Sequence, residues 1–231
     1  MATVFKTTVL ALTMAVLFSG CGKSSSSKKL DKEIRLTGTS RQKADLQKAI
    51  DKKFENTEAH YELAKLYSSD GLFDKAEWHY NIVTGFDPVH HLAQAGMVKM
   101  LAASGRAERS RITAEMYMNQ AGVSAKSSYL LGQAFQKELM DEYAMACYQQ
   151  ALALAPDSAA INKQIGLYYL SKNDKARAEE YFRRSFQIDP YQVDISGQLG
   201  RMGVEVAVPR KTKKQSGDKV DKLAKKEKEK K

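Results

Sequence analysis

The fold is decided by two consecutive stretches of sequence, AKSSYLLGQAFQKELMDEYAMACYQQALALAPDS (125–158) and AAINKQIGLYYLSKNDKARAEEYFRRSFQIDPYQ (159–192). The stretches have equal length, and their small, aromatic and proline residues coincide in the pairs Gly132 and Gly166, Ala144 and Ala178, Tyr148 and Phe182, and Pro156 and Pro190. This period of 34 residues is much longer than a helical turn or a strand repeat. It therefore indicates a repeated unit that contains more than one secondary-structure element.

The same period extends toward the N-terminus. Pro88 lies 68 residues before Pro156, and Pro156 lies 34 residues before Pro190. Because 68 is twice 34, one further unit is expected between the first two prolines. The sequence then divides into the four units 57–90, 91–124, 125–158 and 159–192.

Three of the units share a large apolar and a small residue in their first half and an alanine and an aromatic residue in their second half: Leu63, Ala64, Ala76 and Tyr80; Leu131, Gly132, Ala144 and Tyr148; Ile165, Gly166, Ala178 and Phe182. Unit 91–124 matches more weakly and has Gly122, an ordinary helix stop, in place of the proline. This pattern resembles the tetratricopeptide repeat family, in which the small residue lets two antiparallel helices approach and the aromatic ring fills the space between them. The resemblance implies an all-α fold, a right-handed α-solenoid of helix-turn-helix repeats.

The segments on either side of the repeats are expected to cover the two ends of the array. Residues 39–56 are predicted to form an N-terminal capping helix, in which Thr39 and Gln42 form a capping box. The apolar face of this helix consists of Leu46, Ala49, Ile50 and Phe54. Residues 193–209 are predicted to form a C-terminal cap and an extended segment, because solenoids need their last apolar face shielded. In that segment residues 204–208 alternate like a strand.

The N-terminus has the features of a targeting sequence. Residues 1–20 combine one positive charge with a short apolar stretch, which indicates a signal peptide rather than a membrane span. The residues before Cys21 resemble the lipobox of bacterial lipoproteins, although Phe18 stands where that family usually has leucine. This resemblance implies lipidation of Cys21 and, because Gly22 rather than aspartate follows it, an outer-membrane location facing the periplasm. Residues 21–38 are predicted to be the lipidated cysteine and a flexible linker.

The net charge of +10 is concentrated at the two ends of the chain. Residues 57–192 carry a net charge of −2, which excludes a broad cationic face for nucleic acid. Residues 210–231 carry +7 and are predicted to be a disordered basic tail. Such a tail either adheres to anionic lipid or an anionic envelope polymer, or only increases solubility.

No catalytic motif, paired-cysteine metal spacing or nucleotide-binding loop occurs in the sequence. His90 and His91 lie at a repeat junction, and Cys147 is interpreted as a small packing residue. We therefore expect no enzyme activity, no cofactor, no metal and no small-molecule substrate.

The resemblance to tetratricopeptide repeats implies a binding groove on the face of the first helix of each unit. Carried over by register, the groove residues are Tyr61, Lys65, Lys99, Lys126, Tyr129, Gln133, Lys137 and Lys163. The lysines predict a cationic track for an acidic peptide segment or a C-terminal carboxylate, with the tyrosines as flat contact surfaces. The alternative is that these lysines are only solvated helix-surface residues.

Together these patterns predict a lipid-anchored scaffold or assembly factor that binds a protein partner at the bacterial cell envelope. Two alternatives remain open at this point. One is a lipoprotein that resembles the pilotins of pilus and secretion assembly, and the other is a binder of cell wall or anionic surfaces that acts through the basic tail.

Overall fold

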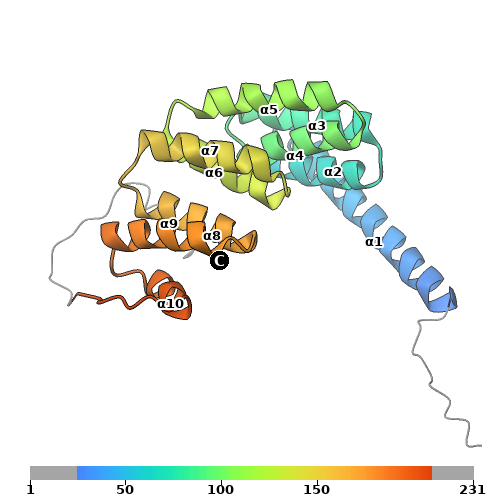
Figure 1. The fold of residues 1–231 in the computed structure, drawn as a ribbon. Helices are drawn as coiled ribbons and strands as arrows, with labels where there is room; N and C mark the ends of the chain where they lie inside the picture. The colour runs from blue at the N-terminus through green and yellow to red at the C-terminus, as the bar shows by residue number, and fades with distance from the viewer. Residues whose placement is uncertain (1–24, 210–231) are drawn as a thin grey trace, which may run out of the picture. The chain divides into compact units, whose positions relative to one another are not determined.

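The computed structural model describes residues 25–209, with side chains from residue 38 onward. This part of the chain is all-α and contains no strand (Figure 1), which confirms the predicted fold class. The contacts divide it within the first helix, into residues 25–42 and residues 43–209. The helices are α1 (Ser25–Lys52), α2 (Thr57–Ser69), α3 (Phe73–Phe86), α4 (His91–Ala103), α5 (Ala107–Ala121), α6 (Ala125–Lys137), α7 (Asp141–Leu154), α8 (Ala159–Ser171), α9 (Lys175–Ile188) and α10 (Val193–Arg201).

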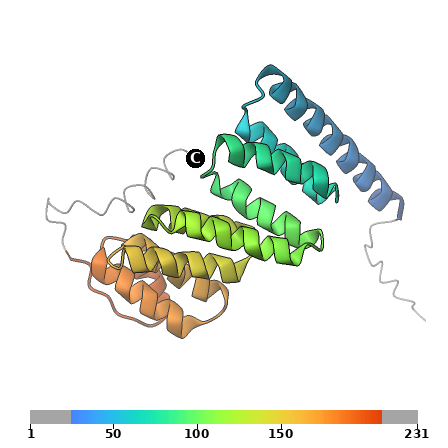
Figure 2. The ribbon, with the colours of Figure 1, turned by 90° about the horizontal axis from the view of Figure 1, so that it is seen from above.

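Helices α2 to α9 form four antiparallel pairs that follow one another in sequence order (Figure 2). The first helix of each pair begins at residue 57, 91, 125 or 159, which is the first residue of a unit defined by the proline period. A side chain caps each of these four starts by accepting a hydrogen bond from a backbone N–H of the first turn. The caps are Asn56, His90, Ser124 and Ser158.

Close contact between the two helices of a pair depends on glycine in the last two units. A Cβ atom added to Gly132 would lie 2.7 Å from ring atoms of Tyr148, and one added to Gly166 would lie 2.6 Å from ring atoms of Phe182. Because real Cβ atoms do not approach other atoms so closely, no larger residue fits without movement of the aromatic ring. The predicted pairing of small and aromatic residues is therefore present as a direct contact.

The second pair, α4 and α5, reverses this arrangement. Val98 stands at the position of Gly132, Ala114 stands at the position of Tyr148, and both are completely buried in one apolar cluster. The hydroxyl of Ser110 also donates a 2.7 Å hydrogen bond to the carbonyl of Val98. The large and small residues have exchanged helices, which explains why this unit matches the sequence pattern weakly.

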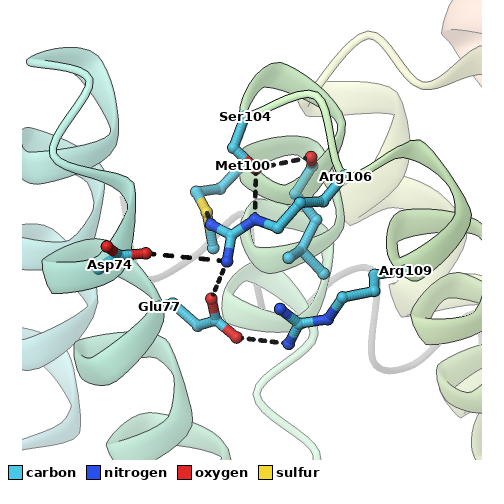
Figure 3. Close-up of polar contacts among 7 residues, drawn as sticks. Asp74, Glu77, Met100, Ser104, Arg106 and Arg109 are labelled. Carbon is cyan, nitrogen blue, oxygen red and sulfur yellow. Dashed lines mark hydrogen bonds and ion pairs between the residues drawn. The ribbon is translucent and has the colours of Figure 1, made fainter.

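A polar cluster joins the first pair to the second (Figure 3). The carboxylate of Glu77 on α3 accepts hydrogen bonds of 2.6 Å from both Arg106 and Arg109 at the start of α5. Arg106 also donates to the Ser104 hydroxyl at 2.8 Å and lies 3.8 Å from a carboxylate oxygen of Asp74. One carboxylate thus connects α3 to the turn between α4 and α5.

The N-terminal helix differs from the predicted capping helix. It begins at Ser25, so Thr39 lies inside α1 and does not cap it. The helix includes most of the segment that we expected to be a linker, because residues 25–38 contain no proline and their three lysines, two leucines and one glutamate favour helix. At the other end, Ile50 packs with Ala59 and Leu63 of α2.

The sequence pattern predicts Phe54 on the apolar face of this helix, but the residue follows the end of α1 at Lys52. Its ring is 49% exposed and contacts the rings of Trp78 and Phe86. The prediction of its position is wrong because the helix ends before this residue, and the chain then turns into α2.

At the C-terminal end, α10 packs on the last pair. Ile195 and Leu199 of α10 are buried in one cluster with Ala178 and Phe182 of α9. Residues 204–208, which alternate like a strand, form no strand, and Val204 instead joins this apolar cluster.

The predicted signal peptide (1–20), Cys21 and the basic tail (210–231) lie outside the described residues. None of the helices in residues 25–209 combines the length and apolar character needed to cross a membrane.

Candidate functional site

The eight predicted groove residues all lie on the first helices of the four pairs, which are α2, α4, α6 and α8. Helix α4 contacts both α2 and α6, so the first three of these helices lie next to one another. The register therefore places the candidate residues on neighbouring helices. Their surroundings differ from one residue to the next.

The two tyrosines are buried rather than available as contact surfaces. Tyr61 is 6% exposed and Tyr129 is 8% exposed. Their rings lie 6.4 Å and 6.0 Å from those of Tyr80 and Tyr148 on the paired second helices. The prediction of flat contact surfaces is wrong for this structure, because the position that the register assigned to the groove also packs against the second helix.

The hydroxyl groups of these tyrosines are set in a polar environment. Gln133 donates a 3.0 Å hydrogen bond from Nε2 to the hydroxyl oxygen of Tyr129. Burial, with further contributions from the carboxylates of Glu138, Glu62 and Glu58, raises the pKa of Tyr61 to about 12. Tyr61 therefore stays protonated at neutral pH and keeps its hydrogen-bond donor.

Two of the lysines are neutralised by nearby carboxylates. Lys65 lies 2.8 Å from Glu62 one turn away and also sits over the ring of Tyr61, with Nζ 4.9 Å from the ring centroid. Lys99 on α4 lies 2.8 Å from Glu138, the residue that follows α6. The ion pair between Lys99 and Glu138 joins the second and third repeats. It lies on the face formed by α2, α4, α6 and α8, which we call the candidate face.

Of the other three lysines, one forms an ion pair and two do not. Lys163 on α8 forms an ion pair with Asp194 on α10. Lys126 and Lys137 on α6 are exposed, and neither forms an ion pair with any described residue. The positive charge that this face can offer a partner directly is thus concentrated on α6.

Glu138 is the residue of this face that the sequence analysis missed. Burial raises the pKa values of both Tyr61 and Tyr80, and the negative charge of Glu138 adds to this effect. Lys99 and Glu138 are 39 residues apart in the sequence. A local sequence pattern cannot predict an ion pair between residues so far apart, because the pair forms only through the stacking of α4 on α6.

A hydrogen-bonded group continues the face toward the last pair. Gln136 Oε1 accepts hydrogen bonds from the Tyr148 hydroxyl at 2.7 Å and from Gln164 Nε2 at 2.8 Å. Because Gln164 belongs to α8, this amide connects α6, α7 and α8.

The remaining candidates have structural roles. His90 caps α4, and His91 lies 3.0 Å from Gln94 through its Nδ1 atom. Cys147 is completely buried, and burial raises the pKa of its thiol to about 12, which disfavours the reactive thiolate. Within the described residues no group of three or more His, Cys, Asp or Glu side chains is arranged to hold a metal ion.

Comparison with known proteins gives one family match. Residues 162–192 match the model of the tetratricopeptide repeat family. They run from the first turn of α8 through the end of α9. No curated protein matches the chain.

Several solved structures have a similar helical arrangement. MamA from Desulfovibrio magneticus RS-1 (residues 41 to the end) is 18% identical, with 72% of this chain and 94% of that chain covered and a TM-score of 0.37. A thermophilic tetratricopeptide protein of Thermus thermophilus is 20% identical, with coverages of 77% and 98% and a TM-score of 0.36. YrrB, described as a tetratricopeptide protein with an unusual peptide-binding site, is 18% identical, with coverages of 68% and 84% and a TM-score of 0.35.

At these identities and TM-scores, the solved structures carry no information about the function of this chain. The family match agrees with the geometry of the last helix pair, in which Gly166 meets the ring of Phe182. The chain therefore contains a tetratricopeptide repeat at residues 162–192, within an all-α fold of stacked helix pairs.

Proposed function

We propose that this protein is a lipid-anchored scaffold of the bacterial cell envelope that binds a protein partner on the face formed by α2, α4, α6 and α8. A tetratricopeptide repeat indicates a role in protein–protein interaction. The candidate face holds lysines, glutamines and ion pairs, which suit recognition of a charged partner.

The observation that carries this proposal is the distribution of lysines on the face. Lys126 and Lys137 are exposed and lack an ion pair among the described residues, and Lys99 is half exposed in its pair with Glu138. Exposed ion pairs are each worth only ~0–1 kcal/mol, so a carboxylate of the partner can replace Glu138 at little cost. The partner is therefore an acidic segment that binds α6 directly and Lys99 by exchange.

Charge reversal on α6 tests the binding face. The variant Lys126→Glu/Lys137→Glu should abolish capture of the partner, because it replaces the two free positive charges of the face with negative ones. The matched control is Lys53→Glu/Lys175→Glu, which changes the net charge equally at two exposed lysines outside the first helices of the pairs. The measurement is crosslinking in intact cells followed by mass spectrometry. If both variants captured the partner equally, the proposal that this face binds the partner would be rejected.

The membrane anchor is proposed from the resemblance of the residues before Cys21 to a lipobox. With several acyl chains, each buried CH₂ contributes ~0.8 kcal/mol, enough to hold the protein at a bilayer. A Cys21→Ser variant should lose incorporation of labelled fatty acid and leave the outer-membrane fraction. Retention of Cys21→Ser in that fraction would show that the anchor is not at this residue.

Deletion of residues 210–231 separates the scaffold from a binder that acts through its basic tail. The scaffold predicts unchanged capture of the partner after this deletion. Loss of capture on deleting the tail, with the folded part intact by circular dichroism, would favour the tail as the binding element.

A further inference from the structure

Each repeat buries one polar side chain at its fourth position. These residues are 0–2% exposed and lie in the first turn of the first helix of their repeat: His60, Gln94, Ser128 and Asn162. Each contacts a backbone carbonyl of the segment that precedes its repeat, namely that of Phe54, Pro88, Ala121 and Pro156, respectively. The shared role is to hold the incoming chain against the first helix of the pair.

In the first three repeats the remaining polar atoms also find a side-chain partner. His60 pairs with His79 at 2.8 Å, and Ser128 lies 2.9 Å from Gln150. The amide oxygen of Gln94 lies 3.0 Å from Nδ1 of His91. A buried polar group is normally satisfied in this way, because leaving it without a hydrogen bond is costly.

The fourth repeat lacks this second partner. The amide nitrogen of Asn162 donates to the carbonyls of Ser158 at 2.9 Å and Pro156 at 3.4 Å, which fixes the orientation of the amide group. Its oxygen, Oδ1, is the one buried side-chain polar atom in the described residues that has no hydrogen-bond partner. The position of His91 is occupied here by Ala159, which has no donor to offer.

Asn162 also lines a pocket between α7, the following turn, α8 and α9. The pocket has a volume of about 280 Å³ and is lined by Leu152, Pro156, Asp157, Asn162, Arg184, Gln187 and Ile188. None of these residues belongs to the candidate face described above. The lining combines Asn162, whose amide oxygen is unused, two side chains with N–H donors, three apolar side chains and the carboxylate of Asp157.

We propose that this pocket is a second binding site, which takes a peptide group and an adjacent apolar side chain from a protein partner. A peptide group has both an N–H for Asn162 Oδ1 and a carbonyl for Arg184 or Gln187. The apolar side chain rests on Leu152 and Ile188. The proposal does not depend on the face that carries Lys99, Lys126 and Lys137, called here the lysine face, because it uses none of those residues.

The acceptor is closed to solvent in the free protein, so the ligand must displace a side chain at the pocket. Arg184 and Gln187 are exposed, and Arg184 is held by Glu180 one turn away on the same helix. Exposed long side chains change rotamer within nanoseconds, and on this proposal such a change at Arg184 or Gln187 uncovers the acceptor.

The probe for this site is N-acetyl-leucinamide, which carries an amide N–H, carbonyls and an apolar side chain. Titrated into the ¹⁵N-labelled full-length chain, it should give saturable NMR shifts at the Asn162 side-chain amide and in residues 184–188. A ligand of this size should bind in the millimolar range. The analogue N-acetyl-N-methyl-leucine dimethylamide keeps the carbonyls and the apolar side chain but has no N–H. It should bind about tenfold more weakly, since it cannot donate to Oδ1.

A matched pair of variants distinguishes a ligand site from a packing defect. Asn162→Ser removes the unused acceptor together with the amide donor to Ser158 and Pro156, so binding of the probe should weaken about tenfold and the melting temperature should fall. Gln94→Ser changes the equivalent position of the second repeat, where the amide is fully used. This control should lower the melting temperature and leave probe binding unchanged.

Three results would overturn the proposal. They are the absence of saturable shifts at the pocket, equal binding of the two probes, and unchanged binding to Asn162→Ser. In each case the acceptor would be satisfied by water or left without a partner. The lysine face would be unaffected by any of these results, since its test uses different variants.

Discussion

Gly132 shows how little room separates the two helices of a repeat. Because its Cβ would lie 2.7 Å from the ring of Tyr148, Gly132→Ala should force the ring away and lower the free energy of unfolding by ~1–3 kcal/mol. Gly85→Ala is the matched control, since no atom lies within 4 Å of its added Cβ and alanine favours helix by up to ~1 kcal/mol. Urea unfolding of both variants measures the difference. If the two variants were equally stable, the ring of Tyr148 would not limit the size of the side chain at position 132.

The buried histidines of the first repeat form a hydrogen bond whose direction is fixed. His60 Nε2 lies 3.0 Å from the carbonyl oxygen of Phe54, which can only accept, so this nitrogen carries the proton. The Nδ1 atom of His60 then accepts from Nδ1 of His79 at 2.8 Å. Protonation of His60 would place two N–H groups against each other and break this contact. The neutral pair is therefore part of the folded state.

This pair predicts a loss of stability in mild acid. Burial, together with the neighbouring His60, lowers the pKa of His79 from 6.5 to about 4. Between these values the unfolded chain binds a proton that the folded chain does not, so stability falls as the pH decreases from 6.5 toward 4. Between pH 7.5 and 5 the contribution of His79 is about 2 kcal/mol.

The measurement is urea unfolding of the wild type and His79→Gln at these two pH values. The variant should be less stable at pH 7.5, but its stability should fall by less on acidification, because one titrating group has been removed. His60 and His91, whose pKa values burial also lowers, retain part of the pH dependence in the variant. Identical pH dependence of the two proteins would show that His79 titrates normally in the folded chain.

At the scale of the helices, Glu77 is the connection between the first and second pairs (Figure 3). Its carboxylate accepts from Arg106 and Arg109 and is largely buried, so Glu77→Ala leaves Arg109 without an ion pair and Arg106 with only Ser104 and the more distant Asp74. We expect a loss of ~1–3 kcal/mol in urea unfolding. Glu115→Ala, which removes an exposed pair with Arg111 on α5, should cost no more than ~0.5 kcal/mol. A similar small loss in both variants would contradict a connecting role for Glu77.

The repeated helices could be located from the sequence because large and small residues must alternate at fixed positions for a pair to pack. The starts of α2, α4, α6 and α8 follow directly from the proline period. The start of α1 could not be located in this way. Residues 25–38 are polar, and their composition suits a solvated helix as well as a linker.

The candidate site was less predictable than the fold. Register gave the correct helices, but it could not show that Tyr61 faces the core or that Lys163 meets Asp194 on α10. Such contacts depend on the rotation and stacking of whole helices. The buried polar residues at the fourth position could have been predicted from the sequence, since His60 and Asn162 occupy the same position of the 34-residue repeat. They are polar, however, and the repeat pattern consists of apolar, small and aromatic positions.

At the scale of the molecule, the helix pairs form an array in which each contacts its neighbours. In such arrays stability is close to a sum of terms for single repeats and for the interfaces between them. A destabilising substitution at one end should therefore lower the local stability of the neighbouring repeats and not that of distant ones. The C-terminal cap provides the place to test this, because α10 packs on α9 through a few apolar side chains.

Leu199 is completely buried between α10 and α9, so Leu199→Ala should cost ~2–4 kcal/mol by leaving a cavity in this contact. Native-state hydrogen exchange should show faster exchange in α8, α9 and α10 and little change in α2 and α3. Val193→Ala alters the same helix at a residue that is 83% exposed, and it should leave exchange unchanged throughout. If Leu199→Ala instead accelerates exchange uniformly from α2 to α10, the described repeats unfold as one cooperative unit. The cap would then stabilise the lysine face as well as the last repeat.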